Sequence, residues 1–286
     1  MSRAVAGGDR IDVAHADGAG ERELTRGQRL DDPSWSPDGA LLAVAGPAGL
    51  AILTADGAPV STITTDPTDS DPDWSPDGSR LAFVRTVRGN QDLFVVSADG
   101  SGLRRLTTAR GRDQEPAWSP NGSTLAFSSR RTGNWELYTV PAAGGRATRL
   151  TRTRVTEGSP SWAPDGAALA FYRTGSAGTR ILVLPVGGRA RRVTRGPGND
   201  FDPAWSPDGS RLAFVGDRGA AVHVYVVPAG GGAAIPVTSG PGRPSGPDWR
   251  PSPGRASASL PAWRSGIGSA TWRPDARSTQ IRSASR

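Results

Sequence analysis

Acidic residues recur at a fixed spacing ahead of a repeated tryptophan in this 286-residue chain. In three of the six repeats one carboxylate directly precedes a proline and another stands two positions earlier, and two further repeats have one of the two. Because alternate residues of a strand share a face, such pairs are expected to project together. A ring of them at the mouth of a channel would attract a divalent cation or a basic peptide. The eight carboxylates are Asp32, Asp69, Asp71, Asp113, Glu115, Glu157, Asp200 and Asp202.

Two other interpretations of these carboxylates stay open. They could be solvated loop acids, some of which accept backbone hydrogen bonds that fix the start of each strand. Alternatively, two carboxylates about 5 to 9.5 Å apart can act on a glycosidic bond, which would make the chain a metal-dependent hydrolase or lyase. A deep asymmetric pocket would favour the enzyme, and a shallow symmetric ring would favour a binding module. We expect no catalytic residue and no cofactor, with calcium as the candidate cation.

The sequence lacks the residues that several other kinds of functional site require. The absence of cysteine excludes disulfides, thiolate metal sites and a cysteine nucleophile. The two histidines, His15 and His223, lie in expected strands, and no G-x-S-x-G sequence accompanies them. The sequence also has no Walker loop, no G-x-G-x-x-G turn after a strand and no H-E-x-x-H motif. The sequence therefore favours binding over catalysis.

The tryptophans that follow the acids mark an internal repeat. Five of them open a version of W-[SA]-P-[DN]-G, and the sixth opens the degraded copy WRPSPG. Their spacings of 39 to 44 residues match the roughly 40 to 45 residues of a four-stranded propeller blade. We expect these side chains to be structural, in the core between blades. They are Trp35, Trp74, Trp118, Trp162, Trp205 and Trp249.

Each repeat has the local pattern of four short strands. In residues 71–107, strands at 71–75, 80–85, 92–97 and 103–107 are separated by Pro-Asp-Gly, a polar loop and Asp-Gly. The side chains after the turn proline should hydrogen-bond nearby backbone amides. These turn residues are Asp38, Asp77, Asn121, Asp165 and Asp208. The sequence therefore predicts an all-β fold, a six-bladed β-propeller of four-stranded antiparallel blades.

The two ends of the chain are predicted to share the last blade. Residues 11–25 resemble residues 94–107, so they would supply the third and outer strands of the blade that begins near Trp249. The second strand could come from 250–264 or from 272–281, and a truncated seventh blade is an alternative. We expect a propeller over 1–249, and a basic Arg/Ser/Ala/Pro-rich segment over 250–286 that partly completes the blade or is disordered.

Net charge is concentrated near the end of the chain. All 34 basic residues are arginine; seven lie from residue 250 onward against one acid, whereas the first 249 residues carry 27 arginines and 26 acids. We therefore expect no nucleic-acid binding by the folded body. No stretch approaches the about 18 consecutive apolar residues of a membrane-spanning helix, so we expect no membrane insertion, and we expect a monomer.

The repeat [DE]-P-x-W-S-P-D-G, followed by L-A-F, A-D-G and R-L-T, resembles that of TolB and related WD-repeat-like bacterial propellers over about residues 11–249. The resemblance implies a non-catalytic scaffold with a protein or peptide partner. TolB-like proteins are often exported, but no signal peptide is visible here, so the sequence as written predicts a cytoplasmic protein. The repeat also resembles propellers of prolyl-oligopeptidase-type peptidases, whose catalytic domain this sequence does not contain. A third interpretation is a blade array cut from a larger protein.

Overall fold

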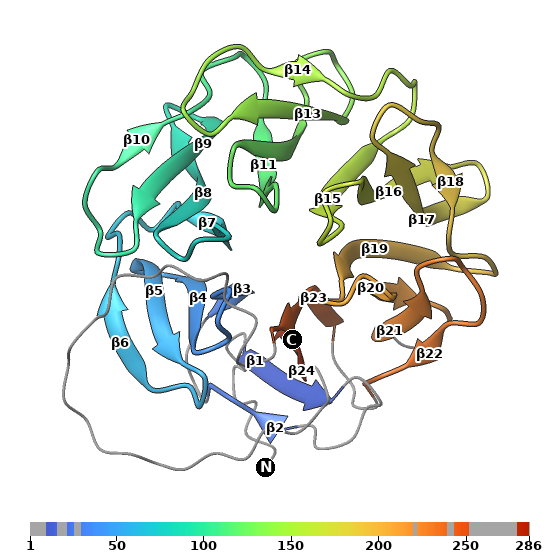
Figure 1. Ribbon diagram of the computed structural model, residues 1–286, viewed down its shortest axis with the longest axis horizontal. Coiled ribbons are helices and arrows are strands. Elements are labelled where there is room, and N and C mark those ends of the chain that lie inside the picture. Colours follow the sequence, from blue (N-terminus) through green and yellow to red (C-terminus); the bar gives the residue numbers. More distant parts are fainter. Residues whose placement is uncertain are drawn as a thin grey trace, which may run out of the picture.

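The strands form a ring of sheets around a central channel (Figure 1). The computed structural model describes residues 10–15, 22–25, 30–219, 222–238, 243–251 and 279–285. Within these residues the strands make six four-stranded antiparallel sheets, and no helix is present. No helix in this part of the chain is long and apolar enough to cross a bilayer. The predicted all-β propeller with four-stranded antiparallel blades is confirmed.

Five sheets are each built from four consecutive strands, with the first strand innermost. Sheet 1 contains β3 (Asp31–Trp35), β4 (Leu41–Gly46), β5 (Gly49–Thr54) and β6 (Pro59–Thr62). Sheet 2 contains β7 (Ser70–Trp74), β8 (Arg80–Val87), β9 (Asn90–Ser97) and β10 (Arg104–Arg105). Sheet 3 contains β11 (Asp113–Trp118), β12 (Thr124–Ser129), β13 (Glu136–Pro141) and β14 (Thr148–Arg149).

Sheets 4 and 5 follow the same plan. Sheet 4 contains β15 (Glu157–Trp162), β16 (Ala168–Gly175), β17 (Gly178–Pro185) and β18 (Arg191–Arg192). Sheet 5 contains β19 (Asn199–Trp205), β20 (Arg211–Asp217), β21 (Val222–Pro228) and β22 (Ile235–Pro236). Because all strands of a sheet are antiparallel, the turn after the first strand and the turn after the third strand lie at one end of the sheet. The loop after the second strand and the connection to the next sheet lie at the other end.

Sheet 6 combines the two ends of the chain, in the order β2-β1-β24-β23. Its strands are β1 (Arg10–His15), β2 (Arg22–Glu23), β23 (Arg243–Arg250) and β24 (Thr279–Ser285). β24 pairs antiparallel with both β1 and β23, so it occupies the second-strand position. Of the two candidates for that position, 250–264 lies outside the described residues beyond 251, and 272–281 lies outside them up to 278. The C-terminal side of the second candidate therefore belongs to the strand that closes the sheet.

The turn after each first strand has the expected side-chain hydrogen bonds. Asp77 Oδ1 accepts hydrogen bonds from the backbone N–H of Ser79 at 3.0 Å and from the hydroxyl of Ser75 at 2.5 Å. Gly78 follows with a φ of 69°, which a residue without Cβ adopts at little cost. Asp38, Asn121, Asp165 and Asp208 accept the corresponding backbone hydrogen bonds. The structural assignment of these turn residues is confirmed.

Apolar side chains fill the seams between neighbouring sheets. The expected core residues Leu81, Phe83, Leu125, Phe127, Leu212 and Phe214 are all fully buried. Four of the repeated tryptophans are buried as well, namely Trp35, Trp74, Trp118 and Trp249. Trp162 and Trp205 are only partly buried.

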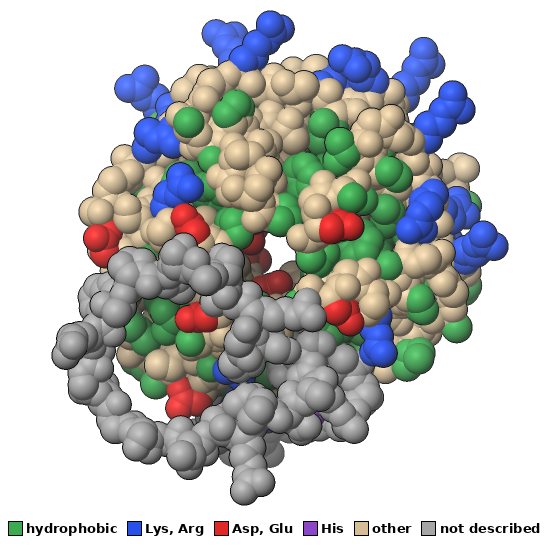
Figure 2. Space-filling model, in the orientation of Figure 1, with side chains coloured by type: hydrophobic (Ala, Val, Ile, Leu, Met, Phe, Trp, Pro, Cys, Tyr) green, Lys and Arg blue, Asp and Glu red, His purple; other side chains and the backbone are tan. Residues whose placement is uncertain are grey.

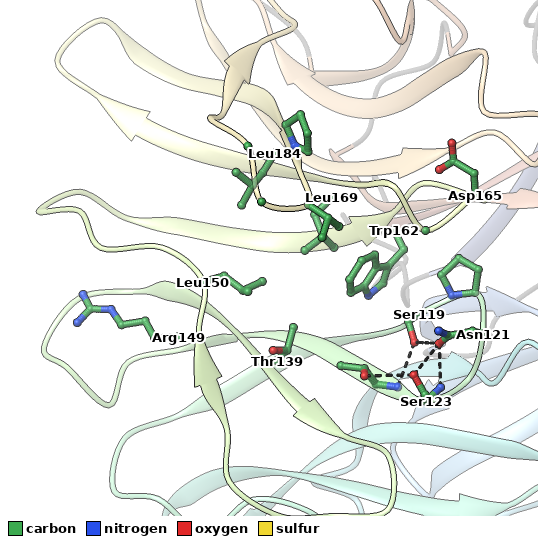
Figure 3. A pocket seen from close by; sticks show the side chains of 17 residues that line it. Ser119, Asn121, Ser123, Thr139, Arg149, Leu150, Trp162, Asp165, Leu169 and Leu184 are labelled. Carbon is green, nitrogen blue, oxygen red and sulfur yellow. Dashed lines mark hydrogen bonds between the residues drawn. The ribbon is translucent and has the colours of Figure 1, made fainter.

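The residue that begins the second strand of the preceding sheet differs between the covered Trp118 and the less buried tryptophans. The Arg80 guanidinium carbon lies 4.7 Å from the ring centroid of Trp118 and covers the indole. The equivalent residues before Trp162 and Trp205 are Thr124 and Ala168, which are too short to do so. A groove of about 900 Å³ lies beside Trp162, between sheets 3 and 4 (Figure 3).

Candidate functional site: a carboxylate-lined central cavity

The inner strands of all six described sheets enclose a central cavity of about 470 Å³. In the space-filling view, acidic side chains are visible around and within the central opening (Figure 2). Among the described residues, no arginine, lysine or histidine belongs to the lining. Six carboxylates do, namely Asp32, Asp71, Asp73, Glu115, Asp202 and Asp248. The described wall of the cavity therefore contains acidic groups and no basic one.

The residue before the first proline of each inner strand has a left-handed backbone. Asp32, Asp71 and Glu115 have φ values of 50°, 50° and 55°, and Ser159 and Asp202 both have 49°. A shift in strand register falls at this position in every sheet. Non-glycine residues in such a conformation cost about 1 to 3 kcal/mol each and often cluster at ligand sites. The repeated strain aims one side chain into the channel from each of five sheets, while the sixth sheet has Gly246 at this position.

This irregularity separates the two carboxylates of each predicted pair. The later member of the pair lines the cavity, as Asp32, Asp71, Glu115 and Asp202 do. The earlier member is buried and forms an ion pair with an arginine from the end of the second strand or the loop after it. These ion pairs are Asp69 with Arg85 at 2.6 Å, Asp113 with Arg131 at 3.0 Å, Glu157 with Arg173 at 2.5 Å and Asp200 with Arg218 at 3.1 Å.

The expectation that both members project together is therefore wrong, because simple strand alternation does not hold across a bulge. Asp69, Asp113, Glu157 and Asp200 are absent from the described lining of the cavity. The sequence contained a signal for their role. An arginine follows each of these acids after 16 or 18 residues. The prediction of a ring of free acids did not consider this spacing.

Hydrogen bonds link the inner carboxylates from one sheet to the next. Asp32 Oδ2 accepts the backbone N–H of Asp71 at 3.3 Å, and Asp71 Oδ2 accepts that of Glu115 at 3.4 Å. Glu115 Oε2 accepts the N–H of Ser159 at 2.6 Å. Each side chain thus contacts the equivalent residue of the neighbouring sheet, so the ring of acids also fastens the sheets to one another.

Ser159 stands where other sheets have a carboxylate, and its hydroxyl bridges two of them. Its Oγ lies 2.9 Å from Glu115 Oε1 and 2.8 Å from Asp202 Oδ1. A hydroxyl has a single hydrogen to donate. Both contacts can be hydrogen bonds only when one of the two carboxyl groups carries a proton and donates it to Ser159. The geometry therefore favours a shared proton in this part of the ring.

Burial raises the pKa of the ring carboxyl groups. The pKa of Asp71 is raised well above its ordinary value by burial and by the neighbouring charges of Asp32 and Glu115. Burial is also the largest cause of the raised pKa values of Glu115 and Asp202. These side chains are partly exposed to the cavity but surrounded by protein on all other sides. A cation that enters the cavity would lower these pKa values and displace protons.

A second set of carboxylates lies deeper along the strands, directly before the tryptophan. Asp73 Oδ2 accepts the backbone N–H of Trp118 at 2.7 Å, and Asp248 Oδ2 accepts that of Trp35 at 2.8 Å. Burial raises the pKa of Asp73 to about 7 and that of Asp248 to about 6. Sequence reasoning missed both residues because only two repeats have an acid at this position.

Carboxyl groups in this arrangement could bind a cation and release their protons to solvent as it binds. Within the described residues no group of three or more histidine, cysteine, aspartate or glutamate side chains has the geometry of a metal site. His15 and His223 lie in β1 and β21, as expected, and neither lines the cavity. The lining therefore offers carboxylates and hydroxyls, which suit a guanidinium or ammonium group.

Comparison with known proteins agrees with the fold. Two solved TolB structures are similar to this chain. The putative TolB from Agrobacterium tumefaciens shares 23% identity with a TM-score of 0.72, over 81% of this chain and 89% of that one. TolB from Acinetobacter baumannii shares 20% identity with a TM-score of 0.73, over 85% and 67%.

A puromycin-hydrolyzing peptidase from Mycobacterium tuberculosis is also similar, with 19% identity and a TM-score of 0.60. The match covers 79% of this chain but 41% of the peptidase. No curated protein matches the chain. The family model of the TolB beta propeller domain matches residues 2–157 and 151–257. The chain therefore belongs to the TolB β-propeller domain family.

Proposed function

We propose that this protein is a scaffold that binds a protein or peptide partner by taking up a cationic side chain of the partner in the central cavity. The observation that carries the proposal is the set of six carboxylates in a cavity wall without a described basic residue. Negative charge that is held out of bulk water and has no counter-charge in the protein attracts a cation from outside. Lysine and arginine of a partner supply such cations at the end of a long, flexible side chain.

The repetition of the ring around the channel supports a binding site rather than a reaction centre. The carboxylates come from equivalent positions of successive sheets, and the one bridged pair, Glu115 and Asp202, is engaged in contacts with the Ser159 hydroxyl. Ser159 and Gly246 take the place of a carboxylate in two sheets. The four remaining ring carboxylates therefore have different neighbours, namely Asp32, Asp71, Glu115 and Asp202. A partner side chain would therefore bind with a preferred orientation. The proposal assigns no reaction to the cavity.

We also infer that the ring is a closed, six-bladed propeller in which both ends of the chain share one blade. Support comes from sheet 6, where β24 joins β1 to β23. In this proposal the propeller domain covers 1–249, and the segment 250–286 contributes the strand that closes it. Closure removes the open sheet edge that a partial ring would expose.

Binding of basic peptides tests the role of the cavity. Fluorescence anisotropy would measure the binding of labelled hexa-arginine and hexa-glutamate to the full chain. We expect hexa-arginine to bind and the double variant Asp71→Asn with Asp202→Asn to weaken its binding at least tenfold. The matched control is Asp77→Asn with Asp208→Asn, which changes two turn carboxylates outside the cavity and should leave affinity within twofold. Equal losses in both variants would place the binding elsewhere.

Calcium provides a separate test of the metal hypothesis. Calorimetric titration of calcium into the wild type and into the Asp71/Asp202 variant separates a metal site from a site for organic cations. We expect no saturable heat from calcium in either protein. A saturable signal that disappears in the variant would replace the peptide proposal with a metal site.

A further inference from the structure

The surface of sheets 2 to 4 has a different charge from the chain average. Between residues 88 and 195 there are seventeen arginines and seven acids. Four of these acids, Asp92, Asp113, Glu136 and Glu157, are fully buried, and Glu115 lines the central cavity. The near-neutral count for residues 1–249 therefore does not describe the surface, because acids are directed inward and arginines outward.

The buried acids are already paired with arginines that lie on the strands or beside them. Asp92 and Glu136 bind Arg105 and Arg149 of the outer strands at 2.6 and 2.8 Å. Asp113 binds Arg131, and Glu157 binds Arg173. The remaining two acids, Asp99 and Asp165, are exposed in turns after a third and a first strand, respectively. Both turns lie at the same end of the sheets, which leaves the opposite end of sheets 2 to 4 without an exposed acid.

That opposite end carries exposed arginines that have no carboxylate partner among the described residues. They lie in the connections from an outer strand to the next inner strand and in the loop after β12. Because all of these segments leave the sheets at the same end, they form one surface. We call it the arginine face, and it consists of Arg110, Arg112, Arg130, Arg152, Arg154 and Arg195.

The composition of this face indicates what kind of partner it fits. Protein interfaces depend on buried apolar or aromatic anchors. The exposed large apolar residues of the described chain, Val60, Leu103, Val186 and Ile235, all lie outside the loops of the arginine face. Guanidinium groups bind phosphate through two parallel hydrogen bonds and need no apolar anchor. The chemistry therefore matches a phosphate polymer better than an acidic protein.

We propose that the arginine face binds the phosphate backbone of double-stranded nucleic acid without regard to base sequence. A duplex presents regularly spaced phosphates to a surface that spans three successive sheets. Single strands are generally held by bases stacked on exposed aromatic rings. The aromatic residue in the loops of this face, Trp135, is only partly exposed. The proposal is independent of the central cavity, whose carboxylates would repel the same ligand.

A salt-dependent binding measurement on the full chain tests the proposal. Anisotropy of a labelled 24-base-pair DNA duplex should give a Kd of about 1 to 100 μM near physiological salt, typical of contacts to phosphate alone. With about four to six phosphates contacted, log K should fall with log[salt] with a slope of about −4 to −5. A second duplex of unrelated sequence should bind within about twofold of the first.

Charge-reversal variants locate the contact. Arg152→Glu with Arg195→Glu should weaken duplex binding at least tenfold and reduce the salt slope by about two. The matched control, Arg146→Glu with Arg189→Glu, changes two exposed arginines in the turns at the opposite end of sheets 3 and 4 and should lose no more than about threefold, through net charge alone. Thermal unfolding of each variant verifies that the fold is retained.

Three outcomes would overturn the proposal. The first is equal loss of binding in the two charge-reversal variants. The second is that the Arg152/Arg195 variant binds normally, whereas binding is lost in a variant with four arginines of the C-terminal segment changed to Gln, namely Arg255, Arg264, Arg273 and Arg277. This result would assign the phosphate contact to the C-terminal segment. The third is binding to vesicles that contain phosphatidylglycerol without binding to the duplex, which would identify an anionic lipid surface as the partner.

Discussion

The carboxylate of Asp73 accepts a hydrogen bond from the backbone N–H of Trp118 in the next sheet, with 2.7 Å between Asp73 Oδ2 and the amide nitrogen. Burial raises the pKa of this carboxyl group to about 7, although the hydrogen bond favours its charged form. The contact therefore joins two blades through a group that changes charge near neutral pH. Asp248 makes the same contact with Trp35, and its pKa is raised to about 6.

The stability of the propeller should consequently fall as pH rises from 5 to 8. In the unfolded chain these carboxyl groups titrate near 3.8, whereas in the folded chain Asp73 and Asp248 keep their protons up to about 7 and 6. Between pH 3.8 and pH 7 the folded state therefore binds more protons than the unfolded state. The resulting contribution to the free energy of unfolding is fully present below pH 3.8 and is lost above pH 7. Urea unfolding at pH 5, 6, 7 and 8 would measure the change, and a rise over this window would contradict it.

Replacing Asp73 by Asn should stabilise the protein at pH 8. The amide oxygen can still accept the Trp118 N–H, while the cost of a buried negative charge disappears. We expect a gain of about 1 to 2 kcal/mol at pH 8, less than the full pKa shift implies because the group is partly exposed. The gain should vanish at pH 5, where wild-type Asp73 is protonated.

Asp77→Asn is the control for this comparison. Asp77 lies four residues away, but hydrogen bonds from Ser75 and Ser79 lower its pKa. The Asn variant should therefore be no more stable than wild type at pH 8. A similar gain in both variants would show that general charge reduction, not the buried Asp73, is responsible.

Removal of the Ser159 hydroxyl should destabilise the ring of inner carboxylates. Ser159→Ala leaves Glu115 and Asp202 without the group that bridges them, and we expect a loss of about 1 to 2 kcal/mol in the free energy of unfolding. The loss should be larger at pH 8 than at pH 5, because protonation relieves the repulsion between the two acids. Ser101→Ala, at an exposed turn position, should change stability by less than about 0.5 kcal/mol.

The sequence predicted the fold because each repeat contains its own turn signals and its own core. Asp77 and Gly78 set a turn, and Leu81 and Phe83 mark a buried strand, independently of other repeats. The candidate site was harder to predict because it depends on contacts between repeats. Asp113 and Glu115 look alike in sequence, but the left-handed backbone at Glu115 sends one to Arg131 and the other to the cavity.

The unequal cover of the repeated tryptophans leads to a final prediction. Arg80 lies over Trp118, whereas Thr124 leaves Trp162 beside an open groove (Figure 3). Thr124→Arg should place a guanidinium over Trp162 and stabilise the protein by about 0.5 to 1 kcal/mol, as expected for a partly exposed cation–π contact. The reverse change, Arg80→Thr, should cost a similar amount by uncovering Trp118.

Acrylamide quenching of tryptophan fluorescence would report the change in cover directly. Quenching should decrease in Thr124→Arg and increase in Arg80→Thr, because the arginine stem and guanidinium shield the indole from solvent. Thr148→Arg, on the outer strand β14 along the same seam, controls for added charge and should leave quenching unchanged. If Thr124→Arg raised stability without reducing quenching, the gain in stability would come from the added charge alone. In that case an arginine at the start of the second strand would not shield the tryptophan of the next sheet.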